Sequence, residues 1–186
     1  MKPKEKSFSA LVKEAAKELP IKKGCCRHAF ADALSLESRF PDDAAKMICG
    51  EDFRCPSCAM NYIRGLFAVY GNVTSPEKAY HLEFSAETEE LCEALDSLLE
   101  KQGMIFRRTK RKGRFIAYIK DSEKIEDFLC CIGLNSFAFD FMNSKIVREI
   151  RNNANRQVNC ETANIGKTVS AAVKQIEDIR YIETHV

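Results

Sequence analysis

Apolar residues repeat every three or four positions near both ends of the chain and alternate with polar residues over short stretches in the middle. The first spacing is typical of amphipathic helices and the second of strands with one buried face. Residues 39–56 follow neither pattern, so we expect an irregular segment with at most a short helix after Pro41. We predict helices over residues 1–20, 25–38, 57–70, 86–102, 121–132, 136–151 and 162–183, and strands over residues 72–74, 80–84, 104–109 and 114–119.

From the third predicted helix to the fifth, the elements follow the order α-β-β-α-β-β-α. Two hairpins separated by a helix normally form one four-stranded antiparallel sheet with helices on one face. We therefore predict an α+β fold with a central domain at residues 53–152, between helical segments at 1–52 and 153–186. Ser85 is the expected N-cap of the middle helix, and the second hairpin should turn at residues 110–113.

The charge of the chain is informative only when it is divided by position. The 186 residues carry a net charge of +2, which gives no sign of a polyanionic partner. Residues 107–114 (RRTKRKGR) alone hold six basic residues and no acid, which leaves −4 for the rest of the chain. A mildly acidic protein therefore carries one concentrated positive segment at the predicted tip of a hairpin.

This basic segment is suited to contacts with phosphates, because Lys and Arg release condensed counterions when they bind a nucleic acid. The alternative is a solvated turn that only keeps the edge of the sheet from aggregating. We predict DNA contact, with two weaker candidates, Lys78 and His81, on the first hairpin. The main candidates are Arg107, Arg108, Lys110, Arg111, Lys112 and Arg114.

Five of the nine cysteines lie close together in the sequence: Cys25, Cys26, Cys49, Cys55 and Cys58. The last two have the C-x2-C spacing that lets two thiolates hold one zinc ion, and Cys49 with Cys25 or Cys26 would complete four ligands. The second C-x2-C of a strong zinc motif is absent. Reduced cysteines packed as small apolar side chains are the favoured interpretation, so no metal and no cofactor are predicted.

The sequence gives little support for an enzyme. It contains no glycine-rich phosphate loop, no H-E-x-x-H motif and no G-x-S-x-G motif. The histidines His28, His81 and His185 are isolated from one another in sequence. No stretch approaches the roughly 20 apolar residues of a membrane span, and the charged N-terminus lacks the apolar core of a signal peptide. We expect a cytoplasmic, non-catalytic protein.

Residues 63–73 (IRGLFAVYGNV) resemble the LAGLIDADG motif of homing endonucleases. The longer run 64–84 (RGLFAVYGNVTSPEKAYHLEF) is similar to the second LAGLIDADG-like repeat of the WhiA family of sporulation and cell-division transcription regulators. Residues 151–182 are similar to the segment that joins this repeat to the family's C-terminal helix-turn-helix. The stretches SFSALVKEAAKEL and KKGCCRHAFADAL resemble the family's N-terminus.

The resemblance implies a LAGLIDADG homing-endonuclease-like αββαββα repeat. The motif helix of that fold packs tightly on a twin helix, and Gly65, Ala68 and Gly71 are the packing residues here. In the nucleases an acidic residue just before the last glycine binds the catalytic metal. Tyr70 occupies that position, and Ala68 occupies the motif's other acidic position. Because a hydrolytic metal needs carboxylate ligands, we predict no catalytic residues and no cleavage, as in the WhiA family.

Two departures from the family affect the expected architecture. Residues 39–56 replace a full ββαββ set, so residues 1–52 should be a remnant of the first repeat. The chain also stops where the family's helix-turn-helix would begin, so we expect a short form that lacks it. The motif helix would then either pair with a second copy in a homodimer or be covered by the helix at 25–38, which has Ala29 and Ala33 on one face.

The resemblance and the basic segment together predict a WhiA-like, nucleoid-associated regulator. It would contact the backbone of duplex DNA through the open sheet face and the basic hairpin. The alternative is a protein-interaction or dimerisation module without direct DNA binding, and a metal-dependent nuclease is disfavoured by Tyr70. Duplex DNA is the expected partner. The sequence leaves two further partners open: a second copy of the chain, bound through the motif helix, and other transcription regulators.

Overall fold

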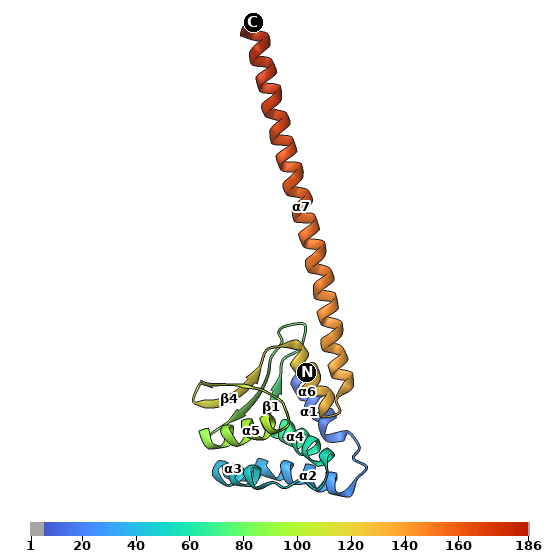
Figure 1. Cartoon of the computed structure of the whole chain (residues 1–186), viewed down its shortest axis with the longest axis vertical. Coiled ribbons are helices and arrows are strands. Elements are labelled where there is room, and N and C mark those ends of the chain that lie inside the picture. The colour runs from blue at the N-terminus through green and yellow to red at the C-terminus, as the bar shows by residue number, and fades with distance from the viewer. Residues whose placement is uncertain (1–5, 186) are drawn as a thin grey trace, which may run out of the picture. The chain divides into compact units, whose positions relative to one another are not determined.

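The computed structural model describes residues 6–185, which form two compact units, one ending at Ser144 and one beginning at Lys145 (Figure 1). The helices are α1 (Phe8–Glu18), α2 (Gly24–Ser35), α3 (Pro41–Gly50), α4 (Pro56–Tyr70), α5 (Glu89–Lys101), α6 (Ser122–Cys131) and α7 (Asn135–His185), with one 3-10 turn at Leu36–Ser38. The strands are β1 (Gly71–Val73), β2 (Leu82–Ala86), β3 (Arg107–Arg111) and β4 (Arg114–Ile119).

The four strands form one antiparallel sheet in the order β1-β2-β4-β3. β2 and β4 are the central strands and pair through Phe84 and Ala117, so the two hairpins are joined into a single sheet. Helices α4 and α5 pack against one face of it, as Figure 1 shows, and α2 and α3 form a further layer beneath them. The predicted α+β fold, with its αββαββα order, is confirmed.

The core lies between the sheet and the helices and is dominated by aromatic rings. Four phenylalanine rings form a cluster in which the centroids of contacting rings lie 5.7 to 6.2 Å apart. They belong to Phe67 of α4, Phe84 of β2, Phe128 of α6 and Phe106, which precedes β3. Most of these pairs meet edge to face, which is the arrangement that ring quadrupoles favour. The cluster fixes the position of α4 under the centre of the sheet.

Helix α4 is apolar around most of its circumference because it is covered on two sides. Pro56 begins it, where the missing amide hydrogen costs nothing. Phe67 faces the sheet, whereas Gly65 faces α2. Arg64 is buried as well, with its guanidinium 4.9 Å from the centre of the Phe30 ring and one nitrogen donating to the carbonyl oxygen of Leu19 at 3.2 Å.

Helices α2 and α4 run parallel and approach very closely. A Cβ atom on Gly65 would lie 2.6 Å from Cβ of Ala33 and 2.9 Å from the carbonyl oxygen of Phe30, so only glycine fits. Of the two alternatives for the motif helix, the structure shows the one within a single chain, where α2 covers it. A homodimer through the same face would require α2 to leave it.

Two predicted boundaries were wrong for local reasons. The segment after Pro41 is a regular ten-residue helix, α3, because Pro41 opens it and Asp42 and Asp43 complement its dipole in the first turn. Helix α5 begins at Glu89, where the side chain of Thr88 accepts a hydrogen bond from the Leu91 amide at 3.3 Å. Ser85, the expected cap, lies inside β2 instead.

The second unit consists of the α7 residues from Lys145 onward. The predicted interruption at residues 152–161 is absent and the helix is continuous, because this polar stretch contains neither proline nor glycine. Its apolar residues repeat at helical spacing, as predicted, and are exposed. Among residues 6–185 the structure has no helix that is both long and apolar enough to cross a membrane. The exposed apolar positions include Val158, Ile165, Val169, Val173, Ile176 and Ile179.

The close approach of α2 and α4 can be tested by adding one methyl group. Gly65→Ala places a Cβ in the space held by Ala33 and Phe30, so we expect a loss of about 1–3 kcal/mol in the free energy of unfolding. Urea unfolding followed by near-ultraviolet circular dichroism, which reports the aromatic core, measures it. The matched control is Gly50→Ala at the end of α3, where nothing lies within 4 Å. A Gly65→Ala protein as stable as the control would contradict the packing described.

Candidate nucleic-acid interface

The hairpin of β3 and β4 turns on two residues, Lys112 and Gly113, both with positive φ (52° and 77°). This is the geometry of the tight turns whose twist matches that of the strands they join. The turn is shorter than the predicted one at 110–113 and places Arg111 opposite Arg114. Successive residues of a strand point to opposite faces, so this register divides the basic cluster between the two faces of the sheet.

Three of the six predicted arginines and lysines share the open face, which is the face turned away from the helices. Arg107 lies opposite Tyr118, and Arg111 lies opposite Arg114. All three arginines are exposed. Arg114 is held along the sheet by its Nε, which donates to Oγ of Ser85 at 2.7 Å, and by a looser ion pair with Glu87 at 3.5 Å.

Arg108 and Lys110 lie on the other side, at the edge that the helices cover. The guanidinium of Arg108 pairs with Glu93 at 2.8 Å and with Asp96 at 3.4 Å, both on α5. Lys110 places its Nζ 4.4 Å from the centre of the Phe115 ring. The charged groups of these two residues therefore lie apart from those of Arg107, Arg111 and Arg114, although Lys110 also lines the depression described below. Lys112 stands at the tip between the two sets.

The open face also carries a carboxylate that the sequence analysis missed. Glu83 of β2 is only 6% exposed. Its Oε2 accepts from Nη2 of Arg111 at 3.0 Å and lies 2.8 Å from Nε2 of His81. Asn72 donates to the other carboxylate oxygen at 3.4 Å. Burial alone would raise the pKa of Glu83, but the hydrogen bonds from His81 and Asn72 and the charge of Arg111 hold this pKa below its usual value.

The two weaker candidates on the first hairpin differ in their surroundings. The His81 ring is largely covered, bonded to Glu83 and 5.7 Å from the ring of Tyr118, so it supports the face rather than extending from it. Lys78 is exposed in the turn before β2. Lys120 was missed, although it continues the alternation of Arg114 and Tyr118 by one step. Its Nζ lies 5.2 Å from the centre of the Tyr118 ring.

A shallow depression of about 260 Å³ lies at the middle of this face. Its lining combines the buried carboxylate with arginine and lysine side chains and two aromatic rings. Cations around a single acid favour an anionic ligand, and the rings offer apolar surface next to it. The lining residues are His81, Glu83, Thr109, Lys110, Arg111, Ile116, Tyr118 and Lys120.

The end of the motif helix has no catalytic carboxylate. Tyr70 is half-buried, and its hydroxyl donates to the carbonyl oxygen of Leu36 at 3.2 Å, while Ala68 is buried. Gly71 follows at once, and a Cβ there would lie 2.3 Å from the Phe67 ring. Of the predicted packing residues, Gly65 lies against Ala33 and Phe30 of α2, whereas the close neighbour of Gly71 is Phe67 of α4 itself.

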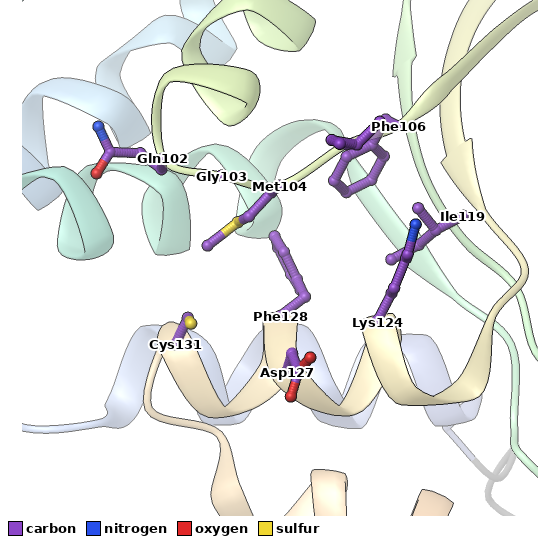
Figure 2. Close-up of a pocket in the computed structure, with 10 residues that line it drawn as sticks. Gln102, Gly103, Met104, Phe106, Ile119, Lys124, Asp127, Phe128 and Cys131 are labelled. Atoms are coloured by element: carbon purple, nitrogen blue, oxygen red, sulfur yellow. The ribbon is translucent and has the colours of Figure 1, made fainter.

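A separate, mainly apolar pocket of about 270 Å³ lies between α6 and the link from α5 to β3. Figure 2 shows Met104, Phe106 and Phe128 around it, with Lys124 and Asp127 of α6 at its side. It has no cluster of titratable groups aimed at one point. We therefore do not include it in the candidate interface.

Among residues 6–185, the group that could hold a metal ion is formed by Cys25, Cys26, Cys55 and Cys58, whose sulfur atoms all lie within 4.8 Å of one another. Cys49, the predicted partner of the C-x2-C pair, is exposed and does not belong to this group. The structure instead brings in both Cys25 and Cys26. The sequence pattern could not show this, because α2 meets α4 only in the folded chain.

Two solved structures of DUF199/WhiA proteins share this fold. The crystal structure of full-length DUF199/WhiA from Thermatoga maritima matches with a TM-score of 0.68 and 19% identity, covering 97% of this chain and 81% of the other. The structure of the N-terminal LAGLIDADG domain of DUF199/WhiA matches with a TM-score of 0.54 and 18% identity, covering 69% and 94%. At these identities the likeness shows the fold.

Curated relatives are more similar in sequence. The probable cell division protein WhiA of Clostridium botulinum (strain Hall) is 44% identical over 132 residues, which cover 71% of this chain and 42% of the relative. That of Alkaliphilus metalliredigens is 38% identical over 152 residues, covering 82% and 45%. That of Clostridium beijerinckii is 46% identical over 125 residues, covering 67% and 40%. The chain thus spans less than half the length of these relatives.

Two family models divide the chain between them. Residues 59–151 match the WhiA LAGLIDADG-like domain, and residues 154–186 match the WhiA C-terminal HTH domain. The expectation that the chain lacks the family's helix-turn-helix is therefore wrong. The segment interpreted as a connection to that domain already belongs to it, and its described residues form part of α7. With half of its length matched by the LAGLIDADG-like model alone, the chain belongs to the WhiA family.

Proposed function

We propose that this chain is a non-cleaving DNA-binding regulator whose open sheet face contacts the backbone of duplex DNA. The observation that carries the proposal is the convergence of Arg107, Arg111, Arg114 and Lys120 on one face of the sheet, with Lys112 at the hairpin tip. The match of residues 154–186 to the WhiA HTH domain supports it independently, since that segment supplies a second DNA-binding element.

The shape of the hairpin fits this role. The major groove of B-DNA is about 12 Å wide and admits a two-stranded ribbon. The four cations extend from alternate positions of β3 and β4, so they point the same way and can reach phosphates on either side of the groove. Contacts of this kind give affinity and orientation with little sequence preference. Sequence selection then falls to the HTH segment.

Glu83 sets a limit on how strongly the face binds. In the free protein its carboxylate holds Arg111 against the sheet through two contacts of 3.0 and 3.2 Å. A phosphate that approaches Arg111 must compete with this carboxylate. The pairing also keeps the Arg111 guanidinium in a fixed position, so Glu83 lowers affinity while it orients the side chain.

Binding without cleavage follows from the end of the motif helix. Neither Tyr70 nor Ala68 can supply a carboxylate to a metal, and water activation in a hydrolytic site depends on that metal.

The name of the relatives points to cell division, and we propose that this chain acts in the same process, at the nucleoid. We propose that the chain has three functional segments. Residues 1–52 are a remnant of the first repeat, residues 53–152 are the DNA-facing domain and residues 153–186 are the HTH segment.

A second candidate is a protein-interaction module. It is favoured by the exposed apolar residues that repeat along the second unit, such as Val169 and Val173. Exposed apolar surface of this kind commonly marks a contact with another protein. The two candidates are separated by whether the purified chain binds duplex DNA at low salt.

The central prediction concerns three arginines. Arg107→Glu, Arg111→Glu and Arg114→Glu together should weaken binding to a mixed-sequence duplex at least about 100-fold at low salt. They should also reduce the slope of log K against log salt by about 3, because three phosphate contacts are lost. Fluorescence anisotropy over a range of salt concentrations measures both quantities.

The matched control reverses three charges on the helical side, Lys46→Glu, Lys101→Glu and Lys124→Glu, all exposed on α3, α5 and α6. It changes the net charge of the chain by the same amount. If the control weakens binding as much as the arginine variant does, the open face has no special role. If the unaltered chain fails to bind at low salt, the protein-interaction module is the better explanation.

The second prediction concerns the buried carboxylate. Glu83→Gln removes the competitor of Arg111, so binding to the same duplex should become roughly threefold to tenfold tighter at low salt, with a slope steeper by about 1. Glu100→Gln, at an exposed position of α5, makes the same change in net charge elsewhere. Unchanged or weaker binding by a folded Glu83→Gln protein would show that Glu83 does not compete with DNA.

A further inference from the structure

Four cysteines from two helices meet at one end of the α2–α4 pair. Cys25 and Cys26 lie in the first turn of α2, Cys55 is the N-cap of α4, and Cys58 lies in the first turn of α4. Cys26 and Cys58 are buried, and Cys25 and Cys55 are half-buried. The thiols are thus drawn together by the same parallel packing that brings Gly65 against Ala33.

The distances between the sulfur atoms fit a single tetrahedral metal ion. The Sγ of Cys55 lies 3.4 Å from that of Cys58, 3.7 Å from that of Cys26 and 3.9 Å from that of Cys25, and Cys26 to Cys58 is 3.9 Å. A zinc–sulfur bond is about 2.3 Å long, so a regular tetrahedron around zinc holds its sulfurs about 3.8 Å apart. A disulfide would need a separation of about 2.05 Å.

The electrostatic surroundings favour anionic sulfur at this place. The N-termini of two helices point at the cluster, and the amide groups there carry partial positive charge. Arg54 lines the cavity beside Cys25 and Cys58, together with the acids Asp32, Glu51 and Asp52. Four thiolates around one divalent cation would carry a net charge of −2, which the two helix dipoles partly offset.

We propose that Cys25, Cys26, Cys55 and Cys58 bind one zinc ion in a closed structural site. Four protein ligands leave no open position for water or substrate, which distinguishes structural from catalytic zinc. A single ion fits better than an iron–sulfur cluster, because the cysteines of such a cluster bind different irons and are held further apart. The site would fasten the start of α4 to the start of α2. It is independent of the proposed DNA binding.

Zinc binding must displace protons, which makes the affinity depend on pH. Each thiol that is still protonated releases one proton as its sulfur binds the ion. We therefore expect zinc affinity to rise between pH 6 and pH 8.

The direct test is the metal content of the full chain, purified under reducing conditions without chelators. Elemental analysis should find about one zinc per chain. Replacing zinc with Co²⁺ should give the intense sulfur-to-cobalt charge-transfer band and the visible bands of tetrahedral cobalt with four thiolates. This spectrum needs no variant, so the test does not depend on whether an altered protein folds.

Variants then assign the ligands. Cys58→Ser and Cys25→Ser should each lose the metal or bind it much more weakly, whereas Cys49→Ser, from the same stretch of sequence but outside the cluster, should keep it. Removing zinc with a chelator should lower the melting temperature of the unaltered chain but not that of Cys25→Ser.

Several outcomes would overturn the proposal. A reduced, folded chain that binds neither Zn²⁺ nor Co²⁺ would do so, as would iron with inorganic sulfide in place of zinc. A disulfide between two of the four cysteines in freshly prepared protein, detected by mass after alkylation, would identify a redox pair instead. Loss of metal in Cys49→Ser equal to that in Cys58→Ser would place the metal elsewhere.

Discussion

The close contact between α2 and α4 is the constraint on which the rest of the structure depends. The missing side chain of Gly65 allows the backbone of Phe30 and the methyl group of Ala33 to approach α4 directly. On its other side α4 carries Phe67, which holds the aromatic cluster beneath β2. A displacement of α2 would therefore expose a helix that is apolar around most of its circumference and loosen the support of the sheet. Arg64 reinforces the contact, because burying its guanidinium is tolerable only beside the Phe30 ring and the Leu19 carbonyl.

This arrangement explains how one LAGLIDADG-like repeat can stand within a single chain. Helix α2 covers α4 within this chain, and α3 packs on α5. Residues 6–185 form a single sheet, which has one face turned away from the helices. Because successive residues of a strand point to opposite faces, the basic residues are divided between the two faces of the sheet. Arg107 and Arg111 point to the open face, while Arg108 is neutralised by Glu93 and Asp96.

Much of the fold was predictable because it is local. The change from helical spacing to alternation gave the αββαββα order. The helix predicted over residues 121–132 is α6, and Asp121 caps it by accepting from two amides. The faces of the basic residues were not predictable to the same degree. They depend on the register of β3 with β4, and that register is set by a two-residue turn rather than the expected four-residue one. A shift of one residue would have moved Arg108 to the open face in place of Arg107.

The cysteine cluster and the role of Tyr70 could not be predicted, because they depend on contacts between residues that are far apart in the sequence. No local pattern relates Cys25 and Cys26 to Cys55, since their proximity comes from the α2–α4 contact itself. The same contact gives Tyr70 a structural role. At one end of the helix pair the four thiols meet, and at the other the Tyr70 hydroxyl donates to Leu36, which directly follows α2. A carboxylate in place of Tyr70 could not donate that bond, and at neutral pH it would face the Leu36 carbonyl as a second acceptor. The position that binds a catalytic metal in the nucleases thus carries a hydroxyl here, and this hydroxyl ties the end of α4 to the residue that follows α2.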